Sequence, residues 1–108
     1  MPLVNIYFRD KGEEELQKIA PDLKKYLADK LSSTELVLVP SEISIRFLEI
    51  KGGEMIASVE VEIAAHSFAD RVKKQDQVCL DVMNYIKEKT DIADVKVWLQ
   101  LSELGHSW

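Results

Sequence analysis

Apolar and polar positions follow two different periods along the chain, and each change of period marks an expected element. Residues 3–8 are apolar, β-branched or aromatic, which is typical of a strand. Between Glu13 and Leu31 the apolar residues recur at spacings of three and four, so they form one stripe on a helix. Pro21 lies inside this stretch and lacks a backbone N–H, so we expect a kink there or a first turn set apart from the rest.

Two further strands are expected on either side of a turn at Gly52-Gly53. Residues 42–50 alternate inward and outward positions with a period of two, which suits a half-buried strand. Residues 56–65 show the same alternation. A last strand is expected over 95–101, before a tail whose final residue, Trp108, we expect to dock on a neighbouring subunit.

A second helix is expected from the end of the third strand to about Lys89. The stretch 67–70 resembles a capping box, in which Ser67 and Asp70 satisfy the free N–H groups of the first helical turn. The predicted apolar face of this helix consists of Phe68, Val72, Cys79, Val82 and Ile86.

The elements occur in the order β-α-β and again β-α-β, so the chain 1–108 is predicted to be a single α+β domain with pseudo-repeats of about 2–50 and 55–101. Each crossover makes its two strands parallel, which gives one four-stranded sheet with both helices on the same face. The other face receives one of the two alternating sets of the first strand: Val4, Ile6 and Phe8, or Leu3, Asn5 and Tyr7. Because the strands look apolar on nearly both sides, we expect self-association.

Length and charge exclude several classes of protein. A chain of 108 residues with 14 basic and 19 acidic side chains holds one domain, and its net charge of −5 argues against nucleic acid or an anionic membrane as partner. No apolar run approaches the ~20 residues that span a bilayer, and no signal segment is seen at the start. One cysteine and two histidines make neither a disulfide nor a structural zinc site. We therefore expect a reduced, cytoplasmic domain without a metal.

The opening Met1-Pro2-Leu3-Val4, with a proline directly after the initiator methionine, resembles the tautomerase superfamily. Its members include 4-oxalocrotonate tautomerase, macrophage migration inhibitory factor and 5-carboxymethyl-2-hydroxymuconate isomerase. The stretch 67–71, with a long apolar helix behind it, is most similar to the isomerase branch. The resemblance covers nearly the whole chain in architecture and a few residues in detail. It implies a fold like that of macrophage migration inhibitory factor and a homotrimer whose sheets face inward.

The resemblance also implies an activity: a tautomerase or isomerase without metal or organic cofactor, acting on a small 2-hydroxy-dienoate or enol-pyruvate carboxylate. Removal of methionine would expose the nitrogen of Pro2 as a secondary amine that serves as general base. Arginines would bind the substrate carboxylate, and the candidates are Arg46 and Arg71. The family's strand arginine corresponds to Ser44, so Arg46 would act from ~7 Å further along the same face.

Other interpretations remain open. The family uses the same proline for decarboxylation and dehalogenation. The chain is alternatively a trimer of this fold without catalysis, serving as a binding or structural module, because the nitrogen of Pro2 is an amide if methionine is retained. A ferredoxin-like ligand-binding regulator shares the same elements, and it predicts dimers instead of trimers.

Single residues also have plainer roles. Arg46 could pair with Glu60 or Glu62 on a neighbouring strand, an ion pair of small worth. Arg71 could be a solvated residue in the first turns of the second helix. Arg9 follows the first strand, and we expect it to be structural or exposed.

Overall fold

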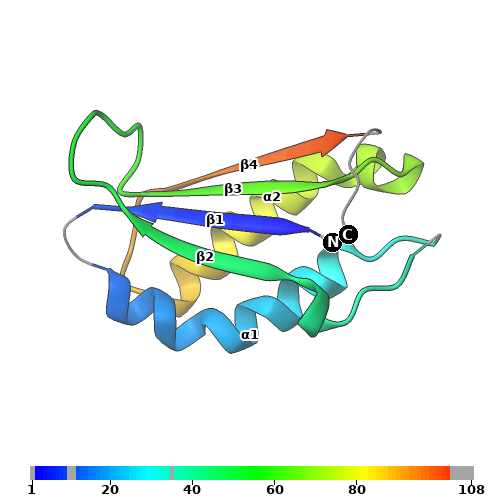
Figure 1. Ribbon diagram of the computed structural model, residues 1–108, viewed down its shortest axis with the longest axis horizontal. Helices are drawn as coiled ribbons and strands as arrows, with labels where there is room; N and C mark the ends of the chain where they lie inside the picture. The colour runs from blue at the N-terminus through cyan, green and yellow to red at the C-terminus, as the bar shows by residue number, and fades with distance from the viewer. Residues whose placement is uncertain (1, 10–11, 35, 103–108) are drawn as a thin grey trace.

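The computed structural model describes residues 2–9, 12–34 and 36–102, and its elements follow the predicted order (Figure 1). Met1 and the tail with Trp108 lie outside the described residues. The elements are, in chain order, β1 (Leu3–Phe8), α1 (Glu13–Leu31), the single 3-10 turn η1 (Pro40–Glu42), β2 (Ser44–Glu49), β3 (Val59–His66), α2 (Ala69–Lys89) and β4 (Val95–Ser102).

The strands form one mixed sheet in the order β2-β1-β3-β4. The pairs β1–β2 and β3–β4 are parallel, each joined through a helix, whereas β1 and β3 run antiparallel at the centre. Both helices lie against one face of the sheet (Figure 1). The two β-α-β units and the sheet with helices on a single face are therefore confirmed.

The core fills the space between the sheet and the helices. Val4 and Ile6 of the central strand have no exposed surface, and they belong to the same apolar cluster as Leu27 of α1 and Val82 of α2. The inward set of β1 is thus the one that contains Val4, and Leu3, Asn5 and Tyr7 face the open side. This alternation decides which side chains a partner or ligand meets on the sheet.

The helix α1 runs unbroken from Glu13 to Leu31. Pro21 lies within it and is exposed, so its missing N–H falls on the solvent side of the helix. The prediction of a first turn set apart from the rest is wrong. Neither α1 nor α2, the two α-helices in the described part of the chain, is long and apolar enough to cross a membrane.

The inward face of α2 differs from the predicted one near its start. Arg71, Val78, Val82 and Ile86 are buried, whereas Val72 is 47% exposed. The buried positions 78, 82 and 86 are four residues apart, and the same stripe extended backwards reaches Arg71 instead of Val72. The predicted inward face of α2 was wrong here because only apolar residues were assigned to it, whereas the arginine Arg71 occupies the inward position.

The strand β3 begins at Val59, three residues later than predicted. The carboxylate of Glu60 accepts hydrogen bonds from the backbone N–H groups of Ile56 at 2.6 Å and Ala57 at 3.2 Å. Because these two N–H groups bind a side chain, residues 56–57 turn away from the sheet ladder. Ile56 is 74% exposed as a result.

Candidate functional site

Pro2 lies buried at the end of the sheet where β1 and β2 begin and β3 ends. Its carbonyl accepts a hydrogen bond from the backbone N–H of Ser44 at 3.2 Å. The next residue, Leu3, pairs with Ala64 near the end of β3. We term the region formed by Pro2, Ser44 and residues 64–66 the N-terminal rim.

Arg71 reaches the same rim from α2, and only 3% of it is exposed. Its Nε donates to the carbonyl of Leu31 at 2.7 Å, and its Nη1 donates to the carbonyl of His66 at 2.8 Å. The guanidinium carbon lies 4.8 Å from the ring centre of Phe68. The expectation of a solvated helix residue is therefore wrong: Arg71 links the end of α1 to the end of β3.

The guanidinium of Arg71 also carries a charge that no anion pairs within the described residues. Its Nη2 is buried and has no hydrogen-bond partner there. Burial lowers the pKa of Arg71, while the nearby Asp70 carboxylate raises it. Since arginine stays protonated in proteins, this is a buried cation, and an unpaired buried charge is costly. Oδ1 of the neighbouring Asp70 is likewise buried without a hydrogen-bond partner among the described residues.

The predicted capping box is wrong. The N-cap of α2 is Phe68, whose side chain makes no capping hydrogen bond. The Oδ2 of Asp70 instead accepts a hydrogen bond from the backbone N–H of Thr34 at 2.8 Å, and this bond lowers the pKa of the Asp70 carboxyl. Asp70 and Arg71 thus both fasten the first turn of α2 to the segment that leaves α1.

Arg46 is exposed on the opposite, open face of the sheet. It pairs in register with Asn5, which in turn pairs with Glu62, so the three side chains form one row across β2, β1 and β3. Within the residues that the structure describes, Arg46 forms no ion pair with Glu62 or Glu60. The structure therefore does not bring Arg46 and Arg71 together in one chain.

The open face has a polar centre, so the prediction that the strands are apolar on nearly both sides is wrong there. Asn5 Nδ2 and the hydroxyl of Tyr7 both donate to Oε1 of Glu62, each at 3.0 Å. These two hydrogen bonds, and more weakly the charge of Arg46, lower the pKa of Glu62. The pKa of Tyr7 is raised, chiefly by its hydrogen bond to Glu62.

Glu62→Gln is expected to destabilise the fold at neutral pH but not in acid. The pKa of Glu62 is lower in the folded state than its ordinary 4.5, so its stabilising charge is present above pH 4.5 and is lost as pH falls through the lowered value. Because the carboxylate is exposed, we expect a loss of at most about 1 kcal/mol at neutral pH. Urea unfolding of both proteins at neutral pH and at about pH 3 measures this. An equal difference at both pH values would contradict the assignment.

Two other reactive side chains, His66 and Cys79, are not candidates for catalysis because of their surroundings. His66 is exposed, and its ring packs edge-on to Phe68 with ring centres 4.8 Å apart. Cys79 is half-buried, and burial raises the pKa of its thiol, which makes it a poor nucleophile at neutral pH. Among the described residues, no group of three or more His, Cys, Asp or Glu side chains could hold a metal ion.

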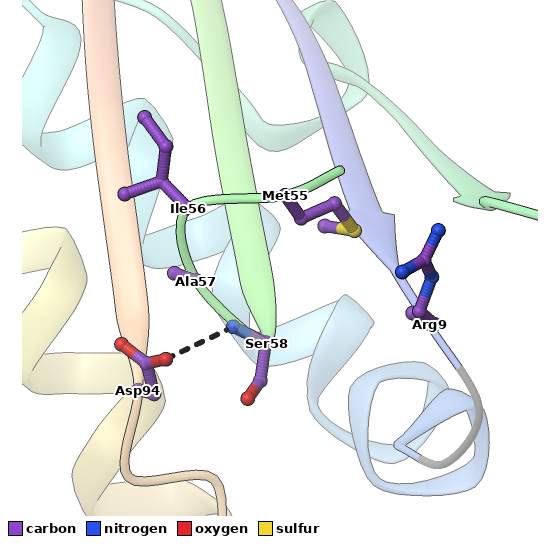
Figure 2. Close-up of a pocket in the computed structure, with 6 residues that line it drawn as sticks. All are labelled: Arg9, Met55, Ile56, Ala57, Ser58 and Asp94. Carbon is purple, nitrogen blue, oxygen red and sulfur yellow. Dashed lines mark hydrogen bonds between the residues drawn. The ribbon is translucent and has the colours of Figure 1, made fainter. Parts of the chain in front are cut away.

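A pocket of about 260 Å³, which was not predicted from the sequence, lies at the opposite end of the sheet from Pro2. Figure 2 shows the residues that line it. We term it the distal pocket. It is lined by Arg9, Met55, Ile56, Ala57, Ser58 and Asp94. Arg9 also donates from Nη2 to the carbonyl of Gly53, which confirms its expected structural role. The signal that could have found this pocket is strand register, because its polar residues come from three distant segments.

No model of a known protein family and no curated protein matches this sequence. Solved structures do match. A macrophage migration inhibitory factor-like protein from Entamoeba histolytica superposes with a TM-score of 0.67 at 18% identity, over 94% of this chain and 88% of that one. Malonate semialdehyde decarboxylase superposes with a TM-score of 0.69 at 10% identity, over 98% and 92%. A fused 4-OT protein described as a symmetric trimer gives 0.64 at 12% identity, over 93% and 85%.

The low identities, 10% to 18% among these three, establish a common fold and leave the activity open. The superpositions cover 93% to 98% of this chain. The fold that the sequence resemblance implied is confirmed. This chain has the fold of the tautomerase superfamily.

Proposed function

We propose that this chain is a cofactor-independent tautomerase or isomerase that moves a proton on a small 2-hydroxy-dienoate or enol-pyruvate carboxylate. The observation that carries the proposal is that a buried proline lies at the N-terminal rim, to which a buried guanidinium with one unpartnered nitrogen also reaches. Leu3 pairs with Ala64, and the carbonyl that Arg71 binds belongs to a residue ~7 Å further along β3. A base and an anion-binding group at this spacing suit a small carboxylate.

Pro2 is the proposed general base. Once methionine is removed, its nitrogen is a secondary amine that takes a proton from one position of the substrate and returns it to another. Burial and a nearby cation both favour the neutral amine, the form that accepts a proton. The structures of malonate semialdehyde decarboxylase include a variant whose first residue, a proline, is replaced by alanine, in work on its decarboxylase and hydratase activities. That this proline was chosen for replacement supports the choice of Pro2 as a candidate here.

The two arginines have different proposed positions relative to the substrate. Nη2 is the one nitrogen of Arg71 without a partner, because Nε and Nη1 donate to the carbonyls of Leu31 and His66. It is buried, so the proposal requires the N-terminal rim to open when the carboxylate binds. Arg46 lies on the open face, so it reaches such a substrate only if a neighbouring copy brings that face to the rim. The proposal therefore includes a homotrimer with the site at a subunit boundary, which the trimeric fused 4-OT structure supports.

Arg46→Ala is expected to raise KM for a carboxylate substrate at least tenfold and to change kcat little. A hydrogen bond to a charged group contributes about 1.5–3 kcal/mol, and tenfold in affinity is about 1.4 kcal/mol. Steady-state kinetics of the variant beside the wild type measure the two constants separately. Arg46→Lys keeps the charge and should recover part of the loss. Unchanged constants in Arg46→Ala would return Arg46 to a structural role.

The experiment that tests the proposal begins with the intact mass of the natively expressed protein. Light scattering and an enol-pyruvate ketonisation assay follow on the same sample. We expect loss of one methionine, a particle of three times the chain mass, and turnover. A trimer with retained methionine and no turnover would support the binding or structural module instead. A dimer without turnover would support the ligand-binding regulator.

A further inference from the structure

The polar residues of the distal pocket form one row across three neighbouring strands. Phe8 pairs with Val59, and Val59 pairs with Val95. Arg9, Ser58 and Asp94 each lie one position beyond these ends of β1, β3 and β4, with Ser58 at the end of the middle strand. Phe8, Val59 and Val95 are buried, whereas Arg9 is half-buried and Ser58 and Asp94 are exposed. The row presents a guanidinium, a hydroxyl and a carboxylate in that order.

The segment before β3 folds back across that strand. Figure 2 shows the loop with Met55 and Ile56 crossing β3. The Glu60 carboxylate holds the loop from below through the backbone N–H groups of Ile56 and Ala57, at 2.6 and 3.2 Å. The positive φ of Gly53, 84°, lets the chain turn back towards β1, where the Gly53 carbonyl accepts from Arg9. Three of the lining residues, Ile56, Ala57 and Arg9, are thus each held by a hydrogen bond.

The side chains of Arg9 and Asp94 can each form a further hydrogen bond. Arg9 uses Nη2 for the Gly53 carbonyl, and no hydrogen bond from its Nε or Nη1 is formed within the described residues. Asp94 uses Oδ2 to accept from the backbone N–H of Ser58 at 3.2 Å, the bond drawn in Figure 2. Its Oδ1 is left for a further donor. Each side chain is therefore held in place by one contact and offers another to a ligand.

We propose that the distal pocket binds a small zwitterion, a molecule with both a carboxylate and an ammonium group, such as a free amino acid. The carboxylate binds the Arg9 guanidinium and the ammonium binds Asp94 Oδ1, two side chains that line the pocket (Figure 2). Arg9 and Asp94 carry opposite charges, and the nearby carboxylate of Glu60 is already bound to the N–H groups of Ile56 and Ala57. A net anion or a net cation therefore leaves either Arg9 or Asp94 without a counter-charge. Met55, Ile56 and Ala57 supply the apolar surface.

The dimensions of the pocket limit both the size of the ligand and its affinity. A volume of about 260 Å³ lies just below the roughly 300–1,000 Å³ of pockets for drug-sized molecules, so the ligand is a small metabolite. Ser58 and Asp94 are exposed, so the ligand stays partly in water. We therefore expect a Kd of about 1 mM. The proposal does not depend on the proposed catalysis at the N-terminal rim, which lies at the other end of the sheet.

The test is a titration of the whole chain followed by the amide NMR signals of Ile56, Ala57 and Ser58. The probes are glycine, β-alanine and 4-aminobutyrate, which place the two charges at increasing separation. Propionate and ethylamine serve as probes with one charge only. We expect saturable shifts with at least one zwitterion near ~1 mM, and at least tenfold weaker binding of both single-charge probes.

Two variants locate the ligand. Arg9→Gln keeps a donor for the Gly53 carbonyl, and Asp94→Asn keeps an acceptor for the N–H of Ser58, while each removes a charge. Each should weaken zwitterion binding at least tenfold. The exposed residues of α1 provide matched controls, Lys18→Gln and Asp22→Asn, which should change nothing.

Three results would overturn the proposal. The first is the absence of saturable shifts with all three zwitterions up to ten times the expected Kd. The second is propionate binding as tightly as the zwitterions, which would leave only an arginine–carboxylate contact. The third is zwitterion binding that survives both Arg9→Gln and Asp94→Asn. The amide spectrum of each free variant shows whether it is folded, and either variant alone decides the location if the other does not fold.

Discussion

Pro2→Ala is expected to lower kcat/KM for ketonisation of an enol-pyruvate substrate by about 10²-fold or more, the usual contribution of a positioned general base. Alanine also permits removal of methionine, so the variant still presents an amine at the same place. It replaces a ring-constrained secondary amine, buried at the start of β1, by a primary amine on a freer residue. The loss therefore reports on the position and basicity of the nitrogen.

The matched control is Pro40→Ala, because Pro40 is exposed at the start of η1 and takes no part in the N-terminal rim. It should keep the wild-type kinetic constants. Intact mass must show the same loss of methionine in Pro2→Ala as in the wild type. A processed Pro2→Ala protein with an unchanged rate would rule out Pro2 as the base, even if the chain turns over substrate by another route.

Arg71→Met is expected to lower the free energy of unfolding by about 2–4 kcal/mol. The side chain is buried, and its removal leaves the carbonyls of Leu31 and His66 without their donors. An unsatisfied buried acceptor costs about 1–3 kcal/mol. Removing an unpaired buried charge offsets part of this cost, which keeps the expected loss below the sum of two such penalties. Urea unfolding, compared through midpoint and slope, gives the difference.

The control for this variant is Lys73→Met, the same loss of positive charge at an exposed position on the same helix. It should stay within about 0.5 kcal/mol of the wild type. If Arg71→Met does not fold, Arg71→Lys keeps the charge but cannot serve both carbonyls in the same geometry, and it should still lose stability. Wild-type stability in both Arg71 variants would contradict a clamp between α1 and β3.

The order of elements was predictable because the strand period of two and the helical spacing of three and four each continue over most of an element. The errors arose where a side chain binds backbone groups that the pattern assigns to regular structure. Glu60 holds the N–H groups of Ile56 and Ala57, so β3 begins later than predicted, and Asp70 binds the N–H of Thr34 just beyond the end of α1. Such contacts depend on the folded position of one carboxylate, which has no signature in sequence spacing.

The two ends of the sheet differ in how far sequence could identify them. Pro2 and Arg71 were candidates through the family resemblance, yet the buried state of Arg71 ran against the general exposure of arginine. The distal pocket was missed because Arg9, Ser58 and Asp94 are neighbours only through the register of three strands. The polar centre of the open face was missed for the same reason, since Asn5 and Glu62 meet only by pairing.

The central position of β1 has a consequence for the timing of catalysis in the proposed enzyme. β1 is hydrogen-bonded on both sides, to β2 and to β3, and the carbonyl of Pro2 itself is tied to Ser44. The conformational entropy of the base is therefore lost during folding, before any substrate arrives. Substrate binding then has only its own freedom to lose, so a small molecule with few contacts can still react at a useful rate.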